Sequence, residues 1–202
     1  MLLVPPHRLG KTERRRAMQQ ACRLGVPANY ASSHQLRPVR EPARLCYIGN
    51  DIQQRPAWLA PRAATAFAAM CRVAAADDIS LQVVSAFRSV GYQLGILQRK
   101  LGQGQEMSAI LKVCAAPGYS EHHSGRAVDL STVGCPPLAE AFENSPAFAW
   151  LLSHAPSFRF RLSYPRNNRH GMVYEPWHWC WQRNKYRHLR LSPGQREHAE
   201  SG

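Results

Sequence analysis

The chain has 202 residues and a hydrophobic fraction of 45%, which predicts one domain with a sizeable core plus terminal segments. No apolar run approaches the roughly 18 to 20 residues of a membrane-spanning helix, so we expect a soluble body without a transmembrane segment. The formal charge of +13 permits polyanionic partners. Its basic clusters, residues 11–16 and 183–190, lie near the chain ends, and we expect no specific nucleic-acid binding.

The six cysteines contain no C-x-x-C pair, which argues against a zinc ribbon or a thioredoxin-type redox site. We expect most of them to be buried thiols. A disulfide between Cys114 and Cys135 stays open if the protein is exported. The apolar start, Met1–Val4, is short and is followed by a basic cluster, the reverse of a signal peptide. As written, the chain is expected in the cytoplasm, or in the periplasm if its true start or export route differs.

In chain order, residues 1–44 are expected to form an N-terminal leader or extension, partly helical or mobile, with a short helix around Thr12–Leu24. Residues 45–187 are expected to form the folded domain, and residues 188–202 a basic or polar tail. A helix is predicted over Ala57–Ala76, because apolar residues recur there at steps of three and four. Its predicted apolar face comprises Leu59, Ala63, Ala66, Phe67, Met70 and Val73.

The remaining elements alternate between strand and helix. Ser89 is a plausible N-cap for a helix with Val90, Leu94, Leu97 and Leu101 on one face. Ser145 and Pro146 make a good start for a helix over Ala147–Ser153. This order predicts an α+β fold in which helices pack against a central antiparallel sheet. The predicted strands are Leu81–Phe87, Lys112–Cys114, Arg126–Leu130, Phe160–Tyr164 and Val173–Trp181, with a turn at Pro117-Gly118.

The first chemical motif follows the Pro117-Gly118 turn, where His122 precedes Asp129 by seven residues. Gly125 between them permits a tight backbone path that could fold both side chains onto one metal ion. Neutral imidazole and carboxylate both suit zinc, and a catalytic zinc site needs only three protein ligands. The alternative is that His122 and His123 are surface residues and Asp129 caps a turn.

The second motif places His178 three residues after Glu175 among large aromatic residues. The aromatics would exclude water and stiffen the ligand, and Glu175 is close enough in sequence to meet a metal-bound water. Such a carboxylate can accept a proton and later return it to the leaving amine. The alternative is an aromatic core cluster with an incidental histidine.

Together these motifs resemble the zinc D-alanyl-D-alanine carboxypeptidases of the VanY type, within the larger group of peptidoglycan peptidases. That group shares an S-x-H-x-x-G-x-A-x-D signature and a distal E-x-W-H. The resemblance also includes the segment from Ser85 to Ser89, and covers about residues 45–182. Every fixed position of the two motifs is matched, by Ser120, His122, Gly125, Ala127 and Asp129, and by Glu175, Trp177 and His178.

The resemblance implies that His122, Asp129 and His178 bind one zinc ion, and that Glu175 is the general base and acid. It also implies that Arg88 stabilises the oxyanion. Ser120 and Gln93 would help to position the substrate, whereas His123 is assigned no role. Cys180-Trp181-Gln182 departs from the arginine, tyrosine and small residue that commonly follow the last histidine in the family, so the details of the substrate pocket stay open.

Three functions are consistent with these motifs. The first is a D,D-carboxypeptidase that removes the terminal D-alanine from peptidoglycan peptides or precursors. The second is an L,D-carboxypeptidase or endopeptidase with the same site, because the metal motif does not set specificity. The third is a cell-wall-binding module without turnover, which the intact Glu175 disfavours, since a pure binder needs no base beside the metal.

Overall fold

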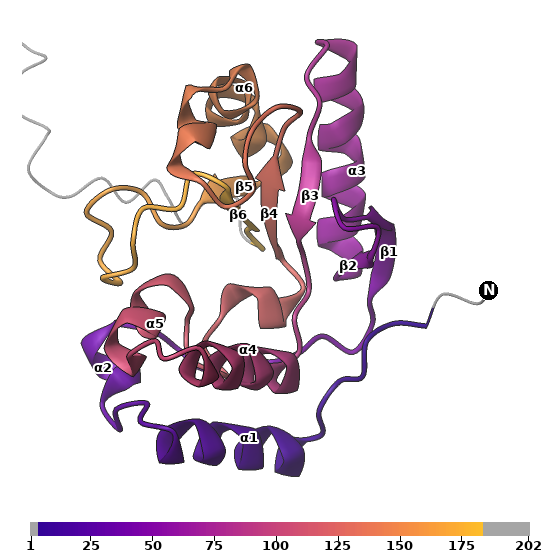
Figure 1. Cartoon of the computed structure of the whole chain (residues 1–202). Coiled ribbons are helices and arrows are strands. Elements are labelled where there is room, and N and C mark those ends of the chain that lie inside the picture. Colours follow the sequence, from indigo (N-terminus) through magenta and orange to yellow (C-terminus); the bar gives the residue numbers. More distant parts are fainter. Residues whose placement is uncertain (1–3, 184–202) are drawn as a thin grey trace, which may run out of the picture.

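A computed structural model of the protein describes residues 4–183. In one part of the molecule, α1 and α4 lie side by side, and α2 and α5 lie next to them (Figure 1). In the other part, α3 and α6 flank a sheet. The predicted tail, residues 188–202, lies outside the described residues. The helices are α1 Lys11–Arg23, α2 Tyr30–Ser33, α3 Pro61–Ala76, α4 Val90–Gly102, α5 Met107–Val113 and α6 Pro146–His154, with 3-10 turns η1 Glu121–Ser124, η2 Glu140–Asn144 and η3 Ala155–Phe158.

The main sheet has four strands in the order β3-β4-β6-β5, and all its neighbours are antiparallel. This confirms the predicted α+β fold with an antiparallel sheet and packed helices. A separate hairpin pairs the first two strands. The strands are β1 Cys46–Asn50, β2 Pro56–Leu59, β3 Gln82–Ser85, β4 Ala127–Ser131, β5 Phe160–Leu162 and β6 His178–Trp181.

The start of the predicted helix over residues 57–76 is wrong. Residues 56–59 form β2, and Trp58 lies opposite Tyr47 of β1. The helix begins only at Pro61, because a residue before proline is disfavoured in helical conformation while proline suits the first helical position. The inward face is otherwise as predicted, with Ala63, Phe67 and Met70 in the core, whereas Val73 is exposed.

Two helix starts are confirmed at their serine caps. The Ser89 hydroxyl accepts a hydrogen bond from the Tyr92 amide at the start of α4, and the Ser145 hydroxyl accepts one from the Phe148 amide at the start of α6. Leu97 of α4 is completely buried in a second apolar cluster, which α4 shares with α1.

The N-terminal segment is partly helical, and its inward side chains are buried. Ala17 and Ala21 of α1 and Tyr30 of α2 lie in the cluster that includes α4. Division of the chain after residue 44 stays a prediction. Over residues 4–183 no helix is both long enough and apolar enough to span a membrane.

Two predicted strands are wrong in whole or in part. The strand expected at residues 112–114 is instead the end of α5, which Cys114 terminates in extended conformation. The strand expected over residues 173–181 is confined to β6. Pro176 has no amide to donate to a sheet, and the amide of His178 turns back to the carbonyl of Glu175. The six cysteines, all within the described residues, are free thiols, Cys114 and Cys135 included. The expectation that most of them are buried is wrong, since only Cys114 and Cys180 are buried.

Candidate metal centre

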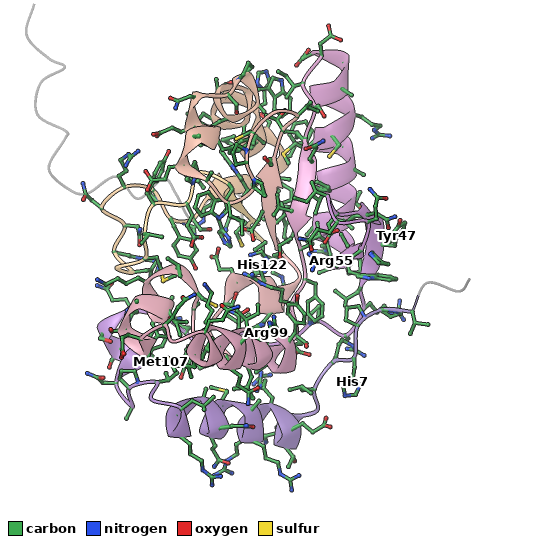
Figure 2. All side chains as sticks on the ribbon, in the orientation of Figure 1. His7, Tyr47, Arg55, Arg99, Met107 and His122 are labelled. Atoms are coloured by element: carbon green, nitrogen blue, oxygen red, sulfur yellow. The ribbon has the colours of Figure 1, made fainter. Side chains whose placement is uncertain are left out.

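Three side chains from separate elements meet at one end of the main sheet. His122 lies in η1, Asp129 in β4 and His178 in β6, and each offers a ligand atom within 4.8 Å of the others. The sheet register causes this meeting, because Asp129 lies directly opposite His178 in the antiparallel pair. All three residues are buried, and the labelled His122 lies between the sheet and α4 (Figure 2).

Gly125 makes the turn that joins η1 to β4. Its φ of 63° is left-handed, and its carbonyl accepts a hydrogen bond from the Ala60 amide at 2.7 Å. A Cβ atom at this position would lie 2.9 Å from the Ala60 nitrogen, closer than side chains approach backbone. Only glycine therefore fits the turn that brings His122 back toward Asp129.

The ring of His122 leaves one lone pair facing a carboxylate. Its Nδ1 donates to the Ala86 carbonyl at 2.6 Å, which assigns the neutral tautomer with an unprotonated Nε2. This Nε2 lies 3.1 Å from Oδ2 of Asp129 and has no hydrogen-bond partner among residues 4–183. Burial, aided by the charge of Arg88, lowers the pKa of His122 to about 4. Two electron-rich atoms that face each other fit a cation between them, and a His-Asp-His set fits zinc.

Both nitrogens of His178 are bound to carboxylates. Nδ1 lies 2.9 Å from Oδ1 of Asp129, and Nε2 lies 3.0 Å from Oε2 of Glu121. Burial opposes the charged ring, but these two hydrogen bonds outweigh it and raise the pKa of His178 to about 10. Against the same opposing effect of burial, the histidines hold the pKa of Asp129 far below its usual range.

Glu121 is a site residue that the sequence motifs did not identify. Its carboxylate accepts hydrogen bonds from His178 and from the Ser163 hydroxyl, and Arg161 lies 4.0 Å away. Although burial opposes ionisation, these partners lower the pKa of Glu121 to about 2. A carboxylate on the outer nitrogen of a metal-binding histidine orients the ring. No local signal marks Glu121, because its partner His178 is 57 residues away.

Glu175 lies at the edge of the cluster, with Oε2 3.8 Å from Nδ1 of His178. Burial raises the pKa of Glu175 to about 7; Asp129 adds to the rise, and His178 opposes it. A carboxyl group poised near neutral pH can both accept and return a proton.

Arg88 lies in the segment between β3 and α4, and its amide points toward the His122 carbonyl at 3.4 Å. Its side-chain Nε is buried without a hydrogen-bond partner among the described residues. After burial, His178 and Asp129, the charge of Arg88 also affects the pKa of Glu175, which it lowers. The cation is therefore near both the candidate ligands and the candidate base.

Ser120 and Gln93 are buried in the frame around the cluster. The Ser120 hydroxyl accepts the His122 amide at 3.3 Å and thereby caps η1. The Gln93 side chain is completely buried, and its Nε2 donates to the Ala115 carbonyl at 2.8 Å. Its Oε1 has no partner within residues 4–183. Substrate contact by these two residues stays a prediction.

Comparison with known proteins gives one family match and several relatives. The sequence profile of VanY, D-alanyl-D-alanine carboxypeptidase, matches residues 56–184. The protein YodJ of Bacillus subtilis (strain 168), which bears the name of a carboxypeptidase, is 31% identical over 156 residues. The aligned part is 76% of this chain and 55% of YodJ, so the chain spans about half the length of this relative.

Two solved structures have a similar fold. The LD-carboxypeptidase LdcB superposes with a TM-score of 0.61 and 30% identity, over 70% of this chain and 69% of LdcB. The vancomycin-resistance D,D-pentapeptidase VanY from a VanB-type cassette, solved in complex with Zn(II), has a TM-score of 0.58 and 24% identity. That superposition covers 72% of this chain and 83% of the pentapeptidase.

Proposed function

Because the chain belongs to the D-alanyl-D-alanine carboxypeptidase family VanY, we propose that it is a zinc-dependent D,D-carboxypeptidase acting on peptidoglycan peptides or precursors. The observation that most supports this proposal is the contact between Nε2 of His122 and the Asp129 carboxylate at 3.1 Å. Both atoms are buried acceptors, and a shared cation would relieve their mutual repulsion. Glu175 beside them has the pKa of an acid-base catalyst.

In this proposal His122, Asp129 and His178 hold one zinc ion. The ion would supply Lewis-acid chemistry, by acidifying the attacking water and polarising the scissile carbonyl. Glu175 accepts a proton from the attacking water and later donates it to the amine of the departing D-alanine. Arg88 stabilises the negative charge that grows on the carbonyl oxygen. Ser120 and Gln93 position the peptide.

L,D-carboxypeptidase activity is the second candidate. It is supported by LdcB, an LD-carboxypeptidase that shares 30% identity with this chain. The two activities differ in the residue that precedes the released D-alanine, so two peptides distinguish them. One ends in D-Ala-D-Ala, and the other ends in an L-configured residue followed by D-alanine. We expect faster release of D-alanine from the first, and preference for the second would assign the L,D activity.

The experiment that tests the catalytic proposal compares wild type with Glu175→Gln, each with zinc and with chelator. We expect zinc-dependent release of D-alanine, and a loss of about 10²- to 10⁴-fold in kcat on removal of the base. Zinc affinity should change little. Glu140→Gln is the matched control, since Glu140 is an exposed carboxylate beside Arg166. A fully active Glu175→Gln enzyme would refute the assignment.

A further inference from the structure

His123 uses both ring nitrogens to hold backbone groups, although the sequence motifs assigned it no role. Nδ1 donates to the Arg88 carbonyl at 2.7 Å, and Nε2 accepts the Gly118 amide at 3.1 Å. The ring is completely buried. With one nitrogen donating and the other accepting, the ring is held in a single neutral tautomer. His123 thus ties the segment before α4 to the turn before Ser120.

The N-terminal segment binds the same two regions, the turn at Gly118 and the start of α4, through Val39 and Glu41. The Val39 amide donates to the Gly118 carbonyl at 2.7 Å. The Glu41 carboxylate accepts the amide of Val90, the first residue of α4, at 2.7 Å, where a negative charge is favourable. Two residues that are close together in the chain therefore anchor both Gly118 and the start of α4.

These contacts close into a ring. The ring runs from Val39 to Gly118, through His123 to Arg88, along the backbone to Val90, and through Glu41 back to Val39. We call this ring the positioning brace. In a closed ring each link restrains the others, so the loss of one link loosens both anchored segments. The family match begins at residue 56, so Val39 and Glu41 precede it.

We propose that the positioning brace fixes the Arg88 guanidinium beside the candidate metal ligands, and so makes the N-terminal segment part of the catalytic site. The inference rests on the proposed function of Arg88. The Arg88 Nε has no hydrogen-bond partner among residues 4–183, so its place depends on the backbone that carries it. A displacement of about 1 Å at such a group can cost about a hundredfold in rate. His123 and Glu41 are positioning residues that act through Arg88.

Amide hydrogen exchange tests the positioning brace in the full-length protein. Glu41→Ala removes the acceptor of the Val90 amide, and we expect faster exchange both at Val90 and at the distant link, the Gly118 amide. Glu13→Ala is the matched control, because Glu13 also binds a backbone amide in the N-terminal segment, that of Gly10, outside the ring. Faster exchange at Val90 with no change at Gly118 would show that the links are independent, and would overturn the proposal.

A double-mutant cycle tests whether the brace acts through Arg88. We expect Glu41→Ala and His123→Asn each to lower kcat about tenfold or more, with zinc affinity within about twofold of wild type. In an Arg88→Ala background the same substitutions should have little further effect. Thermal unfolding of each variant separates this result from a general loss of structure. The same fold-loss of kcat in the wild-type and in the Arg88→Ala background would overturn the proposal, because a general structural role does not require Arg88.

The two proposals fail in different ways. If the wild-type protein releases no D-alanine in the presence of zinc, the proposed function fails. Amide hydrogen exchange still tests the links of the positioning brace, since the exchange measurement needs no turnover. If the wild type is active and the brace variants match it in kcat, the brace proposal alone is wrong.

Discussion

Two glutamates near the candidate metal centre have pKa values that are shifted in opposite directions. Burial raises the pKa of Glu175 to about 7, whereas hydrogen bonds to His178 and Ser163 overcome burial and lower the pKa of Glu121 to about 2. Neighbouring carboxyl groups with separated pKa values commonly divide the roles of catalyst and fixed charge. Here Glu175 is suited to move a proton, and Glu121 is suited to orient an imidazole.

The pH dependence of activity should follow Glu175. The base must be unprotonated to accept a proton from water, and its raised pKa keeps it protonated in acid. We therefore expect kcat/KM to rise between pH 5 and about 7 and then to level off, with a midpoint below the zinc-free value of about 7, because a bound cation favours the ionised carboxylate. Initial rates on a D-Ala-D-Ala peptide at saturating zinc measure this. A flat profile across that range would contradict the role of Glu175.

Removal of the Glu121 carboxylate charge should weaken zinc binding. Glu121→Gln leaves His178 without its ionised partner, so the ring is oriented less firmly and is a poorer ligand. We expect about a 10- to 100-fold lower zinc affinity, measured by competition with a chromogenic chelator. Glu140→Gln, an exposed control, should retain wild-type affinity. Equal affinities for both variants would show that Glu121 does not support His178.

At the scale of elements, the site depends on how two antiparallel strands and one turn meet. The pairing of β4 with β6 sets Asp129 against His178, and the turn at Gly125 returns η1 to β4. His122 is fixed a second way, through its bond to the Ala86 carbonyl next to β3. Each candidate ligand is therefore placed by backbone hydrogen bonds of a different element.

Two glycines allow the turn to be tested. Gly125→Ala introduces a Cβ into a left-handed position and against the Ala60 nitrogen, whereas Gly134→Ala meets the same backbone restriction with nothing within 4 Å. Strain at φ > 0 costs about 1–2 kcal/mol in either variant. We expect Gly125→Ala to be the more destabilised in chemical denaturation, and to lose zinc affinity as well. Equal losses of stability would show that the Ala60 contact is unimportant.

At the scale of the whole molecule, the proposed zinc ion would compete with a proton for His178. Its folded pKa of about 10 lies above the ordinary value of 6.5, since its two carboxylate partners outweigh the opposing effect of burial. In the zinc-free protein the charged ring therefore stabilises the fold fully below pH 6.5, and this stabilisation is lost as the pH rises toward 10. Zinc coordination requires an unprotonated ring nitrogen, so zinc affinity should rise over the same range.

Thermal unfolding with and without zinc measures this competition. As the pH rises, the zinc-free protein loses stability and its affinity for zinc increases. We therefore expect the increase in Tm on adding zinc to be larger at pH 8.5 than at pH 6.5. Chelator should reverse the increase at either pH. A zinc-induced increase that is independent of pH would mean that zinc binding does not displace a proton from His178 into solvent.

Local sequence patterns predicted the elements whose stability is mainly local. The caps at Ser89 and Ser145 and the inward face of α3 follow from hydrogen bonds and spacings within one or two turns. The prediction of a helix at β2 and the prediction of a strand at the end of α5 are wrong, because strand pairing and packing against distant residues decide between helix and strand in short segments. Residues 173–177 were mistaken for strand, since aromatic and β-branched residues can also line an irregular loop.

The two sequence motifs identify the family and the residue types of the candidate site, because each motif specifies particular residues at fixed spacings. The convergence of His122, Asp129 and His178 was implied by that resemblance, and the register of β4 against β6 brings them together. Only the tertiary structure revealed Glu121 as the partner of His178, and His123, Val39 and Glu41 as the supports around Arg88. The contact between Glu121 and His178 joins side chains that are 57 residues apart. The contacts of His123, Val39 and Glu41 involve backbone groups, which every residue has and no motif can mark.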